Sequence, residues 1–209
     1  MSKASTWSLF SILVVLFLVV LHLIYPPSTK AAAGDVLNGY AWSSNIGWIS
    51  LNCNQPAWGA SPASNTCSTS DYKVAMDLAT GNFSGYAWSS NLGWIDFAPA
   101  GGYPAAPNNG AKLIAVPVST CASGKEASGW IRVLSNGSGW DGWIKMAGST
   151  TGGDHYGTCL NSDGKSLGGA NGATDSGYAW GGDVVGWMQF DPAWNKVIKK
   201  SNIIEIPPM

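Results

Sequence analysis

The chain has 209 residues, of which 45% are hydrophobic and 11% are charged, and it includes 12 tryptophans and four cysteines. Its formal net charge is −1; without Lys3 and Lys30, which precede residue 34, nine basic side chains remain against twelve acidic ones, a net charge of −3. Proteins that bind nucleic acid carry clustered positive charge, so this composition excludes nucleic acid as a partner.

The first 33 residues differ in composition from the rest of the chain. Lys3 precedes an uncharged apolar run over residues 9–25, and Ala31-Ala-Ala33 offers a small-x-small site for cleavage. This order predicts an export signal that is removed after Ala33. The apolar run also reaches the lower limit of a membrane helix, about 17–25 residues. Retention of residues 1–33 as an N-terminal membrane anchor therefore stays open, and it would be the only expected contact with a membrane.

A stretch of eleven residues recurs along the rest of the chain. Residues 39–49 read Gly-Tyr-Ala-Trp-Ser-Ser-Asn-Ile-Gly-Trp-Ile, and residues 85–95 repeat them with one Ile-to-Leu change. Degenerate copies begin at Gly129 and Gly177, so the first glycines lie 46, 44 and 48 residues apart. This period predicts one supersecondary unit per repeat. We expect four repeats in one domain over residues 34–209, at about 34–70, 71–110, 111–172 and 173–209.

Period-two alternation within each repeat predicts antiparallel strands. The second repeat is the best preserved, with strands expected over residues 72–77, 83–88 and 93–97 and with Gly, Asn and Ser in the turns. We therefore predict an all-β fold of tandem three-stranded antiparallel meanders, closed as a small propeller-like ring or stacked as a sandwich. The first repeat lacks an upstream strand, so we hypothesise that residues 202–206 pair beside it and close the ring.

The third repeat has the same predicted plan, with strands over residues 112–118, 129–134 and 140–146. Pro117 lacks an N–H to donate, so the first of these strands is expected at a sheet edge.

The four cysteines all follow the predicted export signal. An exported chain meets an oxidising compartment, where two disulfides are expected, and four cysteines allow three connectivities. We favour Cys53–Cys67, which brackets one loop, and Cys121–Cys159, which brackets the third repeat. A zinc site needs closely spaced ligand pairs, which are absent here, so we predict neither a metal nor another cofactor.

The tryptophans and tyrosines of the motif stand beside glycines on facing strands. A ring can lie across glycine backbone where another side chain would collide. Rings that recur at fixed strand positions usually build the core of stacked repeats, so we expect the motif rings in the core. Three tryptophans outside this register are either packing residues or exposed stacking platforms, namely Trp58, Trp140 and Trp194.

The irregular segments between strands are where a binding site is expected. One is the Cys53–Cys67 loop, which holds Trp58, and the other is the glycine-rich stretch of residues 148–171. Aromatic faces beside neutral amides suit neutral sugars, but glycine-rich turns give a similar composition. The candidate ligand-binding residues are Trp58, Trp140, His155, Tyr156 and Trp194.

Residues that could carry catalysis are scarce. His155 is the one histidine after residue 33, so a Ser-His-Asp or Cys-His site would have to use it. Asp96 and Asp191 are the carboxylates that a glycosidase would use, although ordinary polar strand ends explain them as well. We predict no enzymatic activity.

Two clusters of charged residues have simple explanations. Asp154, Asp163 and Asp175 could bind calcium through oxygen, but no D-x-D-x-D-G loop contains them. Lys196, Lys199 and Lys200 are expected to form a solvated face or to protect an edge strand.

The motif of residues 39–50, with the following Asn52-Cys53, Cys67, Tyr72-Lys-Val-Ala-Met-Asp77 and Thr80-Gly81, resembles a tandem-repeat group of exported, mostly uncharacterised bacterial proteins. The resemblance covers residues 37–99 well and 112–192 loosely. The third copy departs from it, because Trp-Ile-Arg replaces Tyr-Ala-Trp. The resemblance implies a secreted or envelope-attached repeat protein and brings no catalytic residues.

Together these observations predict an exported, non-catalytic module at the cell surface or outside the cell that binds envelope or extracellular glycan. One alternative is a structural protein that self-associates into a surface layer or filament. Another is a glycan-active enzyme.

Overall fold

The computed structural model describes residues 36–55, 63–161, 164, 167–169 and 177–190, all within the unit Ala31–Met209. Every strand pairing in these ranges is antiparallel, and their one helix is the four-residue α2 (Gly182–Val185). The predicted all-β fold is confirmed.

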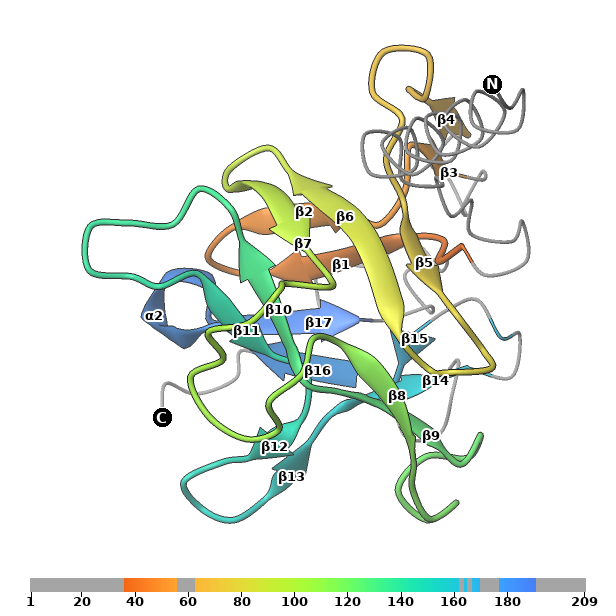
Figure 1. The fold of residues 1–209 in the computed structure, drawn as a ribbon, viewed down its shortest axis with the longest axis vertical. Coiled ribbons are helices and arrows are strands. Elements are labelled where there is room, and N and C mark those ends of the chain that lie inside the picture. The colour runs from red at the N-terminus through yellow and green to blue at the C-terminus, as the bar shows by residue number, and fades with distance from the viewer. Residues whose placement is uncertain (1–35, 56–62, 162–163, 165–166, 170–176, 191–209) are drawn as a thin grey trace, which may run out of the picture. The chain divides into compact units, whose positions relative to one another are not determined.

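Eight strands close into a barrel (Figure 1). Each copy of the motif forms one hairpin, and each hairpin pairs with that of the next repeat. The ring closes where the last strand pairs with the first, with Ala41 opposite Phe190. In order around the barrel the strands are β1 (Tyr40–Ser43), β2 (Gly47–Ser50), β6 (Phe83–Ser89), β7 (Gly93–Asp96), β10 (Trp130–Val133), β11 (Trp143–Lys145), β16 (Gly177–Trp180) and β17 (Trp187–Phe190).

The predicted closure of the repeats into a ring is confirmed, and the stacked sandwich is not formed. The strand hypothesised over residues 202–206 lies outside the described residues. Because β2 and β17 already occupy both edges of β1, the ring is complete without that strand.

The predicted three-stranded meander forms in the second repeat, where β5 (Val74–Met76) pairs with β6. In the third repeat the expected first strand is β8 (Lys112–Ala115), but it pairs with β9 (Lys125–Ser128) instead of β10, so its predicted partner was wrong. Gly129 follows β9 with a φ of 94°, and this bend leads the chain from one sheet into the barrel.

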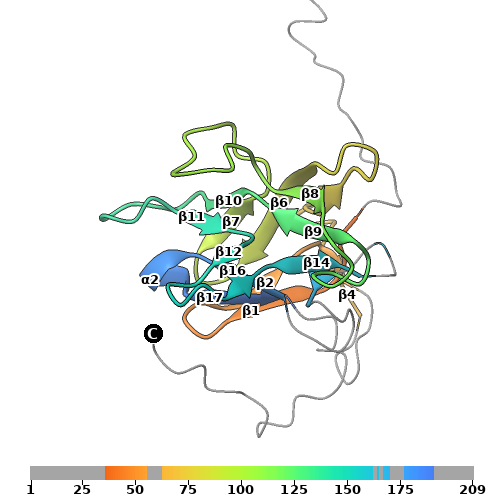
Figure 2. The same cartoon turned by 90° about the horizontal axis from the view of Figure 1, so that it is seen from below.

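Smaller sheets flank the barrel (Figure 2). Strand β8 is the edge of a four-stranded sheet and Pro117 follows it, so the predicted edge position is confirmed. The remaining strands of this sheet and of two short hairpins are β14 (Thr158–Leu160), β15 (Leu167–Gly168), β3 (Asn54–Gln55) with β4 (Ser64–Asn65), and β12 (Gly148–Ser149) with β13 (His155–Tyr156).

Each barrel strand turns one aliphatic side chain of small or medium size inward, and Ser43, Ser89 and Phe190 are buried on the same strand faces. In the first, second and fourth hairpins, the first strand turns an alanine inward and the second strand an isoleucine or methionine, as the narrow interior of an eight-stranded barrel requires. The third hairpin places isoleucine on both strands. These fully buried residues are Ala41, Ile49, Ala87, Ile95, Ile131, Ile144, Ala179 and Met188.

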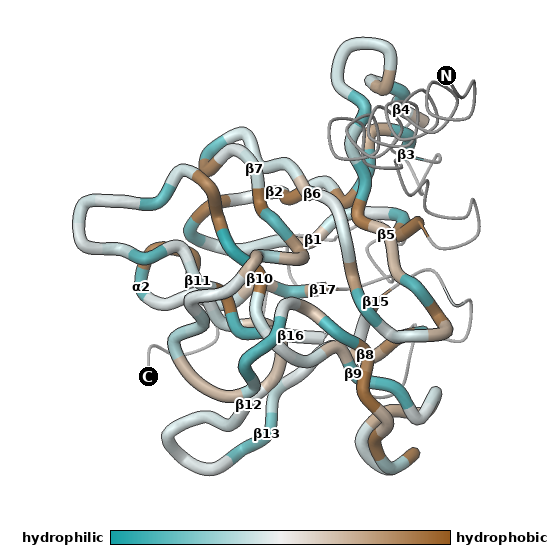
Figure 3. The backbone as a smooth tube through the Cα atoms, viewed as in Figure 1, coloured by the Kyte–Doolittle hydropathy of each residue, from teal (hydrophilic) through white to brown (hydrophobic). Residues whose placement is uncertain are grey.

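The rings of the motif point away from this interior. Successive side chains of a strand point to opposite faces, so the neighbours of Ala41 and Ile49 face outward. Trp48 is 44% exposed, and apolar residues alternate with more polar ones along the barrel strands (Figure 3). The prediction that the motif rings form the core is wrong, because the strand face that closes around the interior carries residues such as Ala41, Ile49 and Phe190, and the rings lie on the other face.

The second glycine of each copy of the motif adopts a positive φ, between 66° and 81°. A Cβ at Gly47 would lie 3.8 Å from the Trp42 ring, and one at Gly93 would lie 3.9 Å from the Trp88 ring, so the rings lie beside these glycines at ordinary contact distance. The positive φ, and not the expected collision with a ring, favours glycine at these two positions.

Turn residues link neighbouring hairpins at the rim of the barrel. The side-chain amide of Asn91 in the second turn donates to the Ile46 carbonyl in the first, at 2.9 Å. The Asn45 amide donates across the closure to the Asp183 carbonyl, at 3.1 Å. The Ser135 hydroxyl joins the third turn to the Leu92 carbonyl of the second. The Asn and Ser residues of the turns therefore hold the ring together as well as reversing the chain.

Both favoured disulfides are confirmed, with Cα–Cα distances of 5.0 Å for Cys53–Cys67 and 5.5 Å for Cys121–Cys159. Two disulfides are typical of a protein in an oxidising compartment. Among the described residues, no helix has the length and apolar character that crossing a membrane requires. The predicted export signal and its cleavage site lie outside these residues.

Candidate functional site

Three aromatic side chains stand out by their exposure: Trp48 at 44%, Tyr86 at 44% and Trp88 at 38%. They are the aromatic members of the exposed large hydrophobic residues in the described part of the chain, and they lie on the neighbouring strands β2 and β6. Contiguous exposed apolar surface marks interaction sites more often than scattered apolar residues do.

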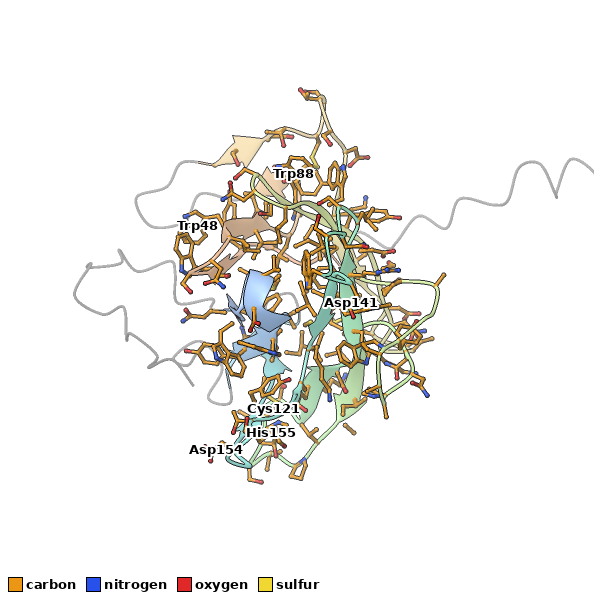
Figure 4. All side chains as sticks on the ribbon, turned by 90° about the vertical axis from the view of Figure 1, so that its left-hand side faces the viewer. Trp48, Trp88, Cys121, Asp141, Asp154 and His155 are labelled. Atoms are coloured by element: carbon orange, nitrogen blue, oxygen red, sulfur yellow. A yellow bond between two sulfur atoms is a disulfide. The ribbon has the colours of Figure 1, made fainter. Side chains whose placement is uncertain are left out.

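The strand register sets these three side chains in a row. Ser50 of β2 lies opposite Trp88 of β6, so Trp48 is the diagonal neighbour of Trp88 on the outer face. Tyr86 follows two residues away on the same face of β6. Adjacent members of this aromatic row (Trp48, Trp88, Tyr86) are therefore about 7 Å apart along the strand direction. Figure 4 shows Trp48 and Trp88 in the same region of the molecule, away from His155.

Two further tryptophans hold the row from its sides. Trp42 packs edge-to-face against Trp48 with ring centroids 4.9 Å apart, and Trp94 packs in the same way against Trp88 at 4.6 Å. Such aromatic pairs contribute about 0.5–1.5 kcal/mol beyond their area burial. Each exposed tryptophan is thereby braced by a less exposed one on the other strand of its own hairpin.

Polar groups near the row are mostly neutral. The Tyr72 hydroxyl donates to Ser50 Oγ at 2.9 Å, and Gln55 Nε2 donates to the same oxygen at 3.1 Å. Neither β2 nor β6 contains a charged residue. At the Tyr86 end, Asp96 lies directly opposite on β7, and the Lys73 carbonyl accepts the Tyr86 N–H. The row thus offers apolar ring faces with the half-buried hydroxyls of Ser50 and Tyr72 beside them.

The same register occurs at all four junctions between hairpins. The residue opposite the central member of the row is Ser50, Asp96, Lys145 or Gln189 in turn. Only in the first row, however, are all three side chains exposed to solvent. The other three rows are Trp94–Arg132–Trp130, Trp143–Trp180–Tyr178 and Trp187–Trp42–Tyr40.

The segment of residues 99–110 covers the rings of the third hairpin. Tyr103 packs on Trp143 with centroids 5.4 Å apart, and the Trp130 indole N–H donates to the Ala105 carbonyl at 3.0 Å. Trp130 and Trp143 are consequently only 9% and 6% exposed. Arg132 lies over the Trp143 ring at 4.9 Å, a cation–π contact where the other repeats have a pair of tryptophans.

Tyr156, a residue predicted to bind ligand, instead packs within the fourth repeat. Its ring meets Trp187 edge-to-face at 4.9 Å, and burial raises the pKa of its hydroxyl. Its neighbour His155 is half exposed and bonds through Nε2 to the buried carboxylate of Glu126, at 2.6 Å. This contact gives the buried Glu126 carboxylate a hydrogen-bond partner and holds β13 beside β9. His155 therefore has a structural partner away from the aromatic row.

The other predicted site residues are not brought together with His155. Trp140 is partly buried against the hydrophobic core, while Trp58 and Trp194 lie outside the described residues. Asp96 accepts the Ala98 N–H at 2.8 Å, and its proposed partner Asp191 also lies outside them. Asp154 is exposed on the loop before β13. The remaining charged candidates fall on residues that are not described: Asp163, Asp175, Lys196, Lys199 and Lys200.

One group of potential metal ligands occurs among the described residues: Cys53, Cys67 and Asp71. Both sulfurs are joined in a disulfide and supply no thiolate, so the donor set does not suit a zinc ion.

The aromatic row was missed because the motif rings were assigned to the core. The signal that could have located it is the residue between the rings: Ala87 separates Tyr86 from Trp88, and a small residue on the opposite face of the strand suits a narrow barrel interior. Comparison of the chain with protein-family models, curated proteins and solved structures finds no match.

Proposed function

We propose that this protein is an exported, non-catalytic surface module that binds envelope or extracellular glycan through the aromatic row of Trp48, Trp88 and Tyr86. The observation that carries the proposal is the row itself, in which three rings are exposed and the two tryptophans among them, Trp48 and Trp88, are each braced by a half-buried tryptophan. A monomeric domain gains nothing from leaving such rings in water, whereas a binding surface needs them.

Sugars match this surface chemically. The C–H face of a pyranose ring is apolar and stacks on an aromatic face, while its hydroxyls need hydrogen-bond partners at the edge. The half-buried Ser50 and Tyr72 hydroxyls lie beside the row and suit that second need. Waters bridging to these groups would serve nearly as well as direct bonds.

The proposal is tested by glycan-array screening of the 34–209 fragment, followed by tryptophan-fluorescence titration with the glycans that bind. We expect Trp88→Ala to weaken binding at least about tenfold, a loss of about 1.4 kcal/mol. Trp180→Ala is the matched control, because Trp180 holds the equivalent place in a less exposed row. Absence of binding to every glycan, or equal loss in both variants, would overturn the proposal.

A second candidate function is self-assembly into a surface layer or filament, since exposed rings also favour association between copies. Sedimentation of the fragment separates the two functions. A monomer at micromolar concentration supports glycan binding. A polymer that no longer forms in the Trp48→Ala variant supports assembly. Export, the retained anchor and the kinship to exported bacterial tandem-repeat proteins remain predictions. A glycan-active enzyme would need two carboxylates at the site. Asp96 lies opposite Tyr86 of the row, and its proposed partner Asp191 lies outside the described residues.

A further inference from the structure

Resting on the proposed function, we infer that the ligand is an extended, uncharged oligosaccharide chain lying along the β2–β6 junction, which stacks on Trp48, Trp88 and Tyr86 in succession. Three features of the described residues support this mode of binding: the curvature of the barrel, the length of the row and the distribution of charge.

Barrel curvature sets the direction of the chain. In a closed barrel of eight strands, the outward direction turns by about 45° from one strand to the next. Trp42 and Trp94 stand on the outer two of four successive strands, so they face directions about 135° apart. A stiff chain wrapped around the barrel cannot stack on both. A chain that follows the β2–β6 junction meets one step of about 45°, between Trp48 on β2 and Trp88 on β6, and it passes over the three exposed rings.

The length of the row requires several sugar units. Tyr86 and Trp88 are two residues apart, and Trp48 is at the level of the residue two beyond Trp88, so the row spans about 14 Å along the strands. One sugar covers one ring face. Only an oligomer therefore fills the row, and each added unit contributes until the third ring is covered.

Charge complementarity favours a neutral chain. Strands β2 and β6 contain no charged residue, and the Tyr86 end has Lys73 and Asp96 on its two sides, one charge of each sign. The neighbouring row differs, since it has Arg132 at its centre and Asp96 opposite. An acidic polymer would meet Lys73 only at the Tyr86 end, where Asp96 lies on the other side and offsets its charge, so little would compensate the loss of the polymer's hydration.

The test uses the 34–209 fragment and two neutral series, cello-oligosaccharides and chito-oligosaccharides, from monomer to hexamer. We expect the affinity for at least one series to rise by about tenfold or more between the dimer and the length that covers all three rings, and then to level off. Tyr86→Ala should shorten the length at which the affinity levels off. Tyr178→Ala, at the equivalent position of another row, should leave that length unchanged.

The possible outcomes separate the two proposals. Binding that is already maximal with a monomer or dimer, or that is insensitive to Tyr86→Ala while Trp88→Ala abolishes it, overturns the extended-chain inference and leaves the glycan-binding function standing. Tighter binding of polygalacturonate oligomers than of neutral ones, with a steep loss on adding salt, overturns the neutral-chain part. No binding in either series or on the array overturns both.

Discussion

Gly85 lies within β6, opposite Val74 of β5, and backbone crowding at this point leaves no room for a Cβ. Its φ is 82°, and a Cβ would lie 2.1 Å from the Lys73 carbonyl oxygen. Gly129, the equivalent residue of the third repeat, has a φ of 94° and a 2.3 Å approach to the Gly110 carbonyl. In the second and third copies the first glycine of the motif is therefore fixed by two independent constraints, conformation and space, whereas Gly177 of the fourth copy has the second alone, with a Cβ 2.2 Å from the Gly168 carbonyl oxygen.

Gly85→Ala should lower the free energy of unfolding by more than about 1–3 kcal/mol, because the methyl group adds a collision to the cost of a positive φ. Urea denaturation followed by tryptophan fluorescence measures the loss. Gly101→Ala is the matched control, since Gly101 has a φ of 138° but nothing within 4 Å of its Cβ position. Equal losses in the two variants would contradict the role given to the collision.

Hairpins and disulfides are the elements that the sequence predicts best. Alternation around the Ser-Ser-Asn turn is a local pattern, and each copy of the motif forms its hairpin as expected. Cys53 and Cys67 were paired because they bracket a single loop, which is also local information. The strand β9 was missed, because Lys125-Glu-Ala-Ser128 has little strand propensity and is held by pairing with β8 and β14.

The face that each strand turns inward could not be read from the motif alone. Alternation shows that Tyr86 and Trp88 share a face and that Ala87 has the other, but it does not say which face is buried. That depends on closure of the sheet. In stacked sheets the rings would fill the core, whereas the interior of an eight-stranded barrel leaves room for Ala87 and Ile95. For this reason the exposed aromatic row could not be recognised from the sequence.

The two disulfides should differ in their contribution to stability. Their cysteines are 14 and 38 residues apart, and in the chain-entropy account the longer loop restricts the unfolded state more. Replacing Cys121 and Cys159 by Ala should cost about 4 kcal/mol, and replacing Cys53 and Cys67 about 3 kcal/mol, at 25 °C.

Urea denaturation of both double variants under non-reducing conditions tests this order. The Cys121–Cys159 pair also ties β14 to the segment before β9, so its loss should expose amides of the four-stranded sheet to faster hydrogen exchange. A larger loss from the Cys53–Cys67 variant would contradict the entropic argument.

At the scale of the whole molecule, closure of the ring couples repeats that are far apart in the chain. Repeats in an open array contact only their neighbours, so such arrays can lose end repeats separately. Here β1 pairs with β17, and the Asn45 amide of the first turn bonds to the Asp183 carbonyl of the fourth. The buried side chains of all four hairpins belong to one continuous core. No repeat of this barrel is therefore terminal.

The barrel should consequently unfold in a single cooperative transition. Ile49→Ala and Met188→Ala remove fully buried side chains from the first and fourth repeats, and each should cost about 2–5 kcal/mol. We expect tryptophan fluorescence and far-UV circular dichroism to give one common midpoint in each variant, with calorimetric and van't Hoff enthalpies equal. Two separated transitions in Met188→Ala, with the first three repeats still folded after the fourth has melted, would show that β1–β17 pairing does not couple the ends of the chain.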